Sequence, residues 1–473
     1  MEKRNDLIAA IATANGRGGI GIIRLSGDET LPTRIADLLK AQATATSPGE
    51  AMEAIMANPR VARRSDFLAA DGSTIDSGIY LYFPAPHSFT GEHVIELHGH
   101  GGPVVMQMLL ARCVELGARL ARPGEFSLRA FLNGKIDLAQ AEAIADLIAA
   151  DTDLAARSAM RSLAGEFSQA IQQLCQALTE MRVLVEATLD FPEEDIDIIR
   201  DADVRTRLQQ LAQKLQAVRQ RAGQGRLLQH GMQVVLAGQP NVGKSSLLNR
   251  LAGEEVAIVT AQAGTTRDSL RSLIQIAGIP VHIIDTAGLR ESQDEVEKMG
   301  IARTWKALES ADLAIFLVDA RDQESAADME LRTRICAKLP AGTPILTVAN
   351  KMDLLAGEAA TATPPDREKT AARLQISAKT GAGIELLRQQ LLSLAGWQPT
   401  ENVFIARQRH LEALSVASAH LGAAQQCVDA AIPQLELLAE ELRLAQQSLG
   451  LISGEFSSDD LLGEIFSHFC IGK

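Results

Sequence analysis

The segment with the clearest chemistry is a glycine-rich turn, GQPNVGKS, between Gly238 and Ser245. It fits the pattern G-x-x-x-x-G-K-[ST], in which backbone N–H groups and a helix N-terminus point at phosphate oxygens. Lys244 adds a mobile positive charge, and the hydroxyl of Ser245 can bind Mg²⁺. An apolar run at 234–237 precedes the turn, and a helix-compatible stretch follows it. An ordinary glycine turn before a helix would fit the same pattern, so the neighbouring motifs decide the interpretation.

Two further motifs would contact the phosphates and the base. DTAG, 285–288, follows the apolar run 281–284; its carboxylate can hold the Mg²⁺ shell and its glycine can meet the γ-phosphate. NKMD, 350–353, follows the run 345–349, and Asp353 can accept hydrogen bonds from N1 and the exocyclic amine of guanine. Adenine lacks this donor pair, and leaving a buried carboxylate unpaired costs about 1–3 kcal/mol or more. This position therefore selects GTP over ATP.

A last motif, SAK at 377–379, follows the apolar run 374–376 and completes the base pocket. Four motifs in this order, each at the carboxyl end of an apolar run, are typical of a doubly wound α/β GTPase sheet. The residues expected to bind the nucleotide and its ions are Asn241, Val242, Gly243, Lys244, Ser245, Ser246, Thr260, Ala261, Gln262, Ala263, Gly264, Thr265, Thr266, Asp285, Thr286, Ala287, Gly288, Asn350, Lys351, Asp353, Ser377, Ala378 and Lys379.

The usual residue for positioning the attacking water is missing. Leu289 follows DTAG where many GTPases carry a glutamine. An arginine finger would be worth about 10³ to 10⁵ in rate, so another source of positive charge is needed. The segment 260–268 is rich in oxygen donors, and Asn241 lies inside the phosphate loop. A monovalent cation held by these oxygens could supply the charge; as a plainer interpretation, the segment is a polar switch loop in either case.

Three sequences carry a resemblance to a known family. GTTRD at 264–268, DTAGLRES at 285–292 and the closing CIGK at 470–473 resemble the bacterial tRNA modification GTPases of the MnmE family, also called TrmE. The resemblance covers essentially the whole chain. Further matches are GRGGIGIIRLSG at 16–27, HSFTGEHVIELHGHGGP at 87–103 and RPGEFSLRAFLNGKIDLAQAEAIADLI at 122–148.

The resemblance implies ion ligands and a catalytic residue. The expected K⁺ ligands are Asn241, Thr260, Gln262 and Thr265, and the expected Mg²⁺ ligands are Ser245 and Thr266. Glu297 matches the family's catalytic glutamate, which acts on the attacking water through a bridging water. By sequence alone, Glu297 in EVEKMG would be an ordinary solvated helix carboxylate.

The resemblance also assigns a folate to the N-terminal part, either 5,10-methylenetetrahydrofolate or 5-formyltetrahydrofolate. Arg24, Glu92 and Lys135 occupy the binding positions, together with Lys473. Arg24 and Lys135 suit the pterin or its charged tail, and Glu92 suits donors on the pterin ring. Without the resemblance, these residues would be interpreted as surface or loop salt bridges.

The implied reaction is the addition of an aminomethyl or carboxymethylaminomethyl group to C5 of the wobble uridine of certain tRNAs. Because no flavin site is visible, the resemblance implies a separate FAD-dependent partner, MnmG. It also implies a homodimer built through the N-terminal domains, and a heterotetramer with MnmG. The alternative is a regulatory GTPase switch in ribosome assembly, whose expected mark is a basic RNA-binding domain. Residues 397–473 instead carry ten acidic and four basic residues, a net charge of −6.

The five cysteines show no C-x-x-C spacing, which fits a reducing cytoplasm. Cys470 follows an apolar run at 465–469 and could be a catalytic thiolate near the one-carbon unit or a buried apolar side chain. A prenylation motif is formally possible there, but the terminal Lys473 disfavours it. A four-histidine cluster, His87, His93, His98 and His100, invites a metal hypothesis. Since no matching carboxylate or cysteine set accompanies it, a polar loop is favoured.

Length and composition predict a large multidomain protein. The chain has 473 residues, 46% hydrophobic content and a formal net charge of −13, which argues against a broad basic nucleic-acid face. No apolar run is long enough to cross a membrane. We expect an α+β N-terminal folate-binding domain, an all-α helical bundle and an inserted α/β P-loop GTPase domain. The expected boundaries are 1–121 for the N-terminal domain, 122–229 and 395–473 for the two helical parts, and 230–394 for the GTPase domain.

Overall fold

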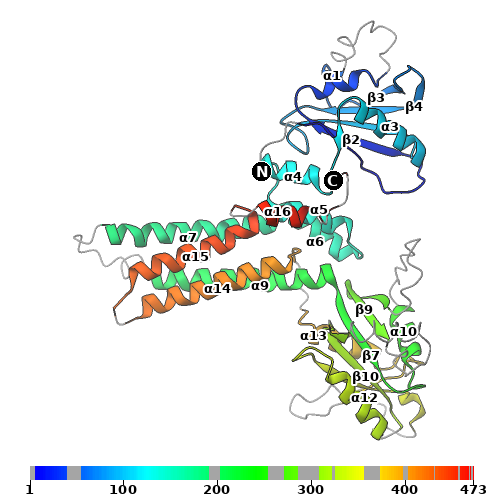
Figure 1. The fold of residues 1–473 in the computed structure, drawn as a ribbon. Coiled ribbons are helices and arrows are strands. Elements are labelled where there is room, and N and C mark those ends of the chain that lie inside the picture. The colour runs from blue at the N-terminus through cyan, green and yellow to red at the C-terminus, as the bar shows by residue number, and fades with distance from the viewer. Residues whose placement is uncertain are drawn as a thin grey trace. The chain divides into compact units, whose positions relative to one another are not determined.

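The computed structural model describes residues 6–39, 55–190, 203–253, 271–285, 308–309, 311–321, 325–355, 373–397, 403–430, 432–455, 459–467, 469 and 472 (Figure 1). Contacts divide the chain into two compact units. The first contains 1–145, 168–180 and 443–473, and the second contains 146–167 and 181–442. No described helix is both long and apolar enough to cross a bilayer.

The first unit is built on a six-stranded sheet, which confirms the predicted α+β N-terminal fold. Its order is β3 (Arg63–Leu68), β4 (Thr74–Phe83), β5 (His93–Gly99), β2 (Gly21–Gly27), β1 (Ile8–Ile11) and β6 (Arg119–Leu120). Neighbouring strands are antiparallel except for the parallel pair β1 and β6. Short apolar runs at 20–25, 79–83 and 94–97 of the sequence predict strands, and β2, β4 and β5 confirm them.

The two faces of this sheet differ in chemistry. Because side chains alternate along a strand, Ile23 and Leu25 of β2 point into a core shared with α1 (Leu31–Ala36) and α3 (Pro103–Glu115). Arg24 and Ser26 therefore belong to the opposite face. There, Ile8 of β1 packs in a small cluster with Phe126 of α4 (Glu125–Leu132). This second face carries the polar residues of interest.

Three helices form an apolar cluster within the first unit. Residues of α4, α5 (Leu138–Ile148) and α16 (Asp459–Ser467) pack around Leu138, Phe466 and Phe469. The backbone of Gly124, at the start of α4, lies so close to Phe466 that an added Cβ would be 2.6 Å from its carbonyl oxygen. This packing brings the carboxyl-terminal part of the chain to α4.

Apolar residues spaced by three and four at 174–185, 204–218 and 435–449 predict three helices with buried stripes, and five further helices are described in the structure. They are α6 (Asp153–Leu163), α7 (Glu166–Asp190), α9 (Val204–His230), α14 (Gln408–Asp429) and α15 (Leu435–Ser453). Leu178 and Val185 of α7, Leu211 of α9 and Leu442 of α15 are all buried, as their spacing requires. The prediction that these stripes are core is confirmed.

The second unit contains the predicted doubly wound sheet (Figure 1). Its order is β12 (Leu374–Gln375), β11 (Ile345–Asn350), β10 (Leu313–Asp319), β7 (Met232–Ala237), β9 (Ile279–Asp285) and β8 (Arg271–Ile276), and β8 alone is antiparallel to its neighbour. Helices α10 (Lys244–Gly253), α12 (Ala326–Cys336) and α13 (Ile384–Leu394) complete the fold. The strand order reverses at β7, and ligands of such sheets bind outside the carboxyl ends at this point.

Candidate functional site

The phosphate-binding turn leaves β7 in a conformation that only certain residues accept. Gly238, Asn241 and Gly243 have φ values of 153°, 65° and 98°. A Cβ on Gly238 would lie 2.3 Å from the carbonyl oxygen of Leu317, and one on Gly243 would lie 2.3 Å from Asn350 Nδ2. The glycines of the motif are therefore required by close approach as well as by φ.

The side chains around this turn suit an anion. Lys244 Nζ donates hydrogen bonds to the carbonyl oxygens of Gly238, at 2.7 Å, and Gln239, at 3.0 Å, so the ammonium lies against the turn. Ser245 and Ser246 are exposed in the first turn of α10, and Asn241 is exposed within the loop. Phosphate oxygens would meet this ammonium together with the helix N-terminus. The donor set also fits Mg²⁺, for which the Ser245 hydroxyl is available.

Asn350 holds the turn and the base-binding segment together. Its Nδ2 donates to the carbonyl oxygen of Val242 at 2.8 Å, and its Oδ1 accepts from the backbone N–H of Ala378 at 2.9 Å. The side chain is buried, with the residue 2% exposed. Asn350 thus acts through two protein contacts, a role that the motif by itself does not reveal.

Asp353 is exposed and oriented by its neighbour Ser377. The Ser377 hydroxyl donates to Asp353 Oδ1 at 2.6 Å and accepts from the backbone N–H of Thr380 at 3.1 Å. Ser377 is fully buried. Ser377 therefore holds the Asp353 carboxylate in a fixed orientation, as recognition of guanine requires. Lys379 is exposed beside it.

Asp319, at the end of β10, was not singled out by the sequence. It accepts hydrogen bonds from Arg321 and, at 2.9 Å, from Lys351 Nζ. The bonds from Arg321, followed by those from Lys351, hold the pKa of Asp319 well below its usual range despite its burial. Asp319 thus holds the ammonium group of Lys351, and its position at the end of a buried strand is the signal that could have identified it.

Several predicted residues lie outside the described part of the chain. Only the backbone of Asp285 is described, at the end of β9. The others are Thr260, Ala261, Gln262, Ala263, Gly264, Thr265, Thr266, Thr286, Ala287, Gly288, Glu297, Cys470 and Lys473. Their predicted roles stay predictions.

In the first unit, Arg24 contacts Gly472 near the end of the chain. Its Nε donates to Glu96 Oε1 at 2.9 Å, and its Nη1 donates to the carbonyl oxygen of Gly472 at 3.3 Å. The guanidinium is 5.9 Å from the ring centres of Phe89 and Phe126. Arg24 and Gly472, which are 448 residues apart in the sequence, are thus brought together.

Glu92 lines a cavity of about 670 Å³ within the first unit. Its walls also include Gly91, Arg122, Asn133 and Phe466. Lys135 is exposed and lies against Gly91, where an added Cβ would be 3.2 Å from the Lys135 side chain. The structure therefore places Glu92 in the cavity wall, Lys135 next to that wall, and Arg24 on the same sheet face as Ser26, which contacts Glu92.

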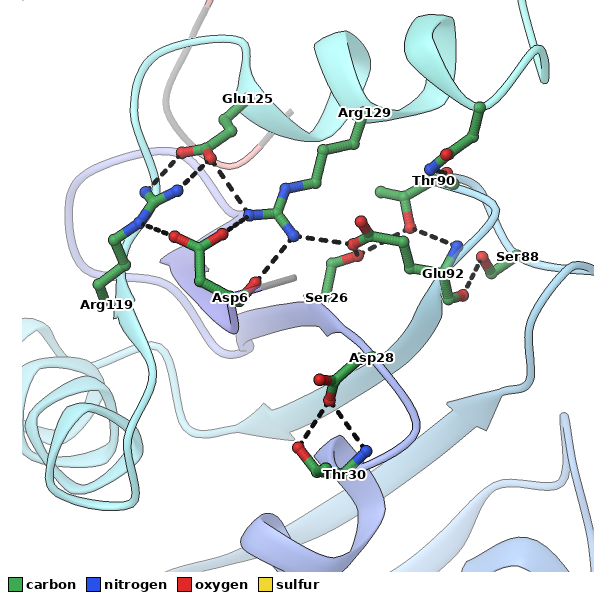
Figure 2. A network of polar contacts seen from close by, with 11 residues as sticks. Asp6, Ser26, Asp28, Thr30, Ser88, Thr90, Glu92, Arg119, Glu125 and Arg129 are labelled. Carbon is green, nitrogen blue, oxygen red and sulfur yellow. Dashed lines mark hydrogen bonds and ion pairs between the residues drawn. The ribbon is translucent and has the colours of Figure 1, made fainter. Parts of the chain in front are cut away.

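An ion network beneath Glu92 was missed by sequence reasoning (Figure 2). Arg129 contacts Asp6, Glu92 and Glu125, while Arg119 contacts Asp6 and Glu125. Burial alone would raise the pKa of Glu125, but the hydrogen bond from Arg119 and the nearby positive charges keep it below its usual value. The same balance lowers the pKa of Asp6. Most of these residues stand in or next to RPGEFSLRAF, but the sequence gives no sign of their partners.

The histidine cluster is not one polar loop, so that interpretation was wrong in part. His93 and His98 lie on β5, where they contact Tyr82 and Glu96. His100 contacts Asp76 just after the strand. Each histidine has a different partner because successive side chains leave a strand on opposite faces. Among the described residues, no group of three or more potential metal ligands is found.

Comparison with known proteins relates the chain to one family. The model "GTP-binding protein TrmE N-terminus" matches residues 7–135, and the model "MnmE helical domain" matches residues 138–470. A relative from Dechloromonas aromatica named tRNA modification GTPase MnmE is 61% identical over 470 residues, covering 99% of this chain and 100% of its own. A relative of the same name from Thiobacillus denitrificans is 55% identical over 474 residues, covering 100% and 99%.

Among solved structures, Era from Aquifex aeolicus bound to GDP·AlF₄⁻ aligns with 40% of this chain and 66% of its own, at 25% identity. Its TM-score is 0.27, too low to support a conclusion. Family membership depends instead on the matched models and on near-complete coverage at more than half identity. The chain belongs to the MnmE family, also called TrmE, of tRNA modification GTPases.

Proposed function

We propose that this chain is a GTPase that takes part in modifying the wobble uridine of certain tRNAs. The observation that carries the proposal is the pair of hydrogen bonds made by the Asn350 side chain. They join the phosphate-binding turn to the SAK segment at the carboxyl edge of the sheet. Asp353 stands on the same edge, oriented by Ser377. Phosphate contacts and guanine contacts are thus built into one surface, as a GTP site requires.

Hydrolysis would be assisted by K⁺, which when bound would add positive charge beside the reacting phosphate. The fit to this chain is supported by Asn241, whose exposed side chain stands on a left-handed residue inside the turn. Thr260, Gln262 and Thr265 would supply the other oxygens, Ser245 and Thr266 would bind Mg²⁺, and Glu297 would act on the attacking water. Lys244 would bind the phosphates in either case.

Replacing the cation tests this proposal. GTP turnover should be at least tenfold faster in K⁺ than in Na⁺ at equal ionic strength, and Asn241→Ala should abolish most of the difference. Asn249→Ala, on the exposed surface of α10, is the matched control and should keep the wild-type ratio. Equal rates in the two cations for the wild-type protein would contradict the K⁺ mechanism but not the family assignment.

The one-carbon donor would be 5,10-methylenetetrahydrofolate or 5-formyltetrahydrofolate, bound in the first unit. The proposal is supported by Glu92 in a cavity wall and by the contact of Arg24 with Gly472. Arg24, Lys135 and Lys473 would serve the pterin or its acidic tail. Cys470 would be the thiol participant.

The remaining chemistry requires a partner. An FAD-dependent protein, MnmG, would supply the redox step and form a heterotetramer with a homodimer of this chain in the cytoplasm. Wobble uridines should be unmodified in tRNA from cells that lack this protein, and restored by the wild-type gene. Normal modification together with defective ribosomal subunits would favour a ribosome-assembly switch instead.

A further inference from the structure

Arg129 is the central cation of the network on the second face of the N-terminal sheet (Figure 2). Its Nη1 donates to Glu92 Oε2 and to the Asp6 carbonyl oxygen, both at 2.9 Å. Its Nη2 donates to Asp6 Oδ1 at 2.8 Å and to Glu125 Oε1 at 3.3 Å. The side chain is only 8% exposed. The planar, rigid fork of the guanidinium allows one residue to hold three separate segments of the chain.

The contacts of Glu92 are asymmetric. Ser26 Oγ donates to Glu92 Oε2 at 2.8 Å, and Arg129 donates to the same oxygen at 2.9 Å. Within the described part of the chain, Oε1 accepts no hydrogen bond, and Glu92 lines the 670 Å³ cavity. A carboxylate offers about four lone-pair sites, so the two on Oε1 remain for a ligand.

Ser26 and Arg129, which hold Glu92, are themselves held by further polar contacts. Thr90 Oγ1 lies 2.7 Å from Ser26 Oγ and accepts from the backbone N–H of Glu92 at 3.2 Å. On the other side, Asp6 and Glu125 hold Arg129. With Arg119, the network contains two cations and three carboxylates, a net charge of −1. That charge favours a ligand which presents N–H donors.

We propose that Arg129 and Ser26 are positioning residues that fix the carboxylate of Glu92, so that Oε1 accepts hydrogen bonds from the amine donors of a pterin in the cavity. This inference rests on the proposed folate site. A glutamate side chain without such contacts would lose rotamer freedom on binding the ligand. Glu92 does not, because Ser26 and Arg129 already hold its Oε2. Arg129, which also lines the cavity, and Ser26 therefore contribute to affinity through the position they give to Glu92.

The test is a titration of the full-length protein with 5-formyltetrahydrofolate and with its analogue lacking the 2-amino group. The wild-type protein should prefer the amino compound by roughly 10- to 100-fold, because the analogue leaves Oε1 without its partner. Arg129→Lys keeps the charge but loses the planar set of guanidinium N–H donors. It should reduce this preference several-fold and raise the dissociation constant for 5-formyltetrahydrofolate about tenfold. Ser26→Ala, which removes a single hydroxyl, should act in the same direction by a smaller factor.

Two comparisons separate positioning from stability. Glu92→Gln should lower the preference at least as far as Arg129→Lys, and the double variant should bind no more weakly than Glu92→Gln alone. Arg112→Lys is the matched control, since Arg112 is also a largely buried arginine paired with a glutamate, but on α3 and away from the cavity. It should bind both ligands as the wild-type protein does.

The outcomes are distinct. An unchanged preference in both Arg129→Lys and Ser26→Ala would overturn the inference, as would an equal loss of affinity for the two ligands. If Glu92→Gln binds 5-formyltetrahydrofolate as tightly as the wild-type protein, the proposed folate role of Glu92 fails, and the inference with it. A reduced preference in all three variants supports both.

Discussion

The nucleotide-binding region and the Arg129 network differ in which part of the chain carries the chemistry. In the nucleotide region, consecutive backbone groups between Gly238 and Ser245 would bind the phosphates, and the side chains mainly brace that loop. In the network, three of the five ion pairs join side chains far apart in sequence, such as Arg129 with Asp6, 123 residues away. Chemistry carried by the backbone leaves a short motif, whereas chemistry carried by paired charges does not.

The largest effect is expected where the nucleotide region depends on one side chain. Asp353→Asn should weaken GTP binding about 100-fold and strengthen binding of XTP, because xanthine has a carbonyl oxygen in place of the exocyclic amine. Fluorescent GTP and XTP titrations measure the change. Ser377→Ala, which removes the hydroxyl that orients Asp353, should weaken GTP binding by a smaller factor without favouring XTP. Equal weakening of both nucleotides in Asp353→Asn would count against guanine recognition by this residue.

A smaller effect should follow from crowding the backbone of the turn. Gly243→Ala places a Cβ 2.3 Å from Asn350 Nδ2 at a φ of 98°. The Asn350 side chain, which donates a hydrogen bond to the carbonyl oxygen of Val242, must therefore move. We expect GDP binding to weaken at least tenfold and the free energy of unfolding to fall by about 1–3 kcal/mol.

Gly422→Ala is the control for that change. Gly422 lies within α14, where an added Cβ meets nothing within 4 Å, and alanine favours helices by up to about 1 kcal/mol. The protein should be as stable or slightly more stable, with GDP binding unaltered. Normal GDP affinity in Gly243→Ala would show that the phosphate loop tolerates the displaced Asn350.

Substitutions in the Arg129 network should leave nucleotide affinity unchanged. Their effect should instead appear in the local stability of the first unit. Glu125→Gln should lower the opening free energy of α4 and β6 by about 1–3 kcal/mol at pH 7, measured by hydrogen exchange, because charge-assisted bonds to Arg119 and Arg129 are lost. Glu115→Gln, which changes an exposed carboxylate paired with Arg112 on α3, should change little.

The effect of Glu125 has a definite pH dependence. Its folded pKa lies below the unfolded value of about 4.3, so its contribution is present above that value and is lost as the pH falls through the folded pKa. The difference between the wild-type protein and Glu125→Gln should therefore shrink below about pH 4. A difference that stays constant down to pH 3 would assign the effect to packing.

Much of the fold could be predicted because its signals are local. Alternating or continuous apolar runs located the strands around Ile23, Ile95 and Val234, and spacing by three and four located the buried stripe through Leu178. The histidine interpretation failed in part for a physical reason. His93 and His98 look like one cluster by sequence distance, but the strand sends them to opposite faces.

Sequence alone determined the order of the GTPase motifs, the helical stripes and the family, since each depends on residue types at short, regular spacing. Only the tertiary structure decided that Asn350 ties two loops together, that Gly472 meets Arg24, and that Arg129 orients Glu92. The first of these depends on the sheet of the second unit, and the other two depend on where β1, β2 and α4 meet after folding. A charged side chain takes its role from the opposite charge that burial places beside it, and that partner is not fixed by its neighbours in the chain.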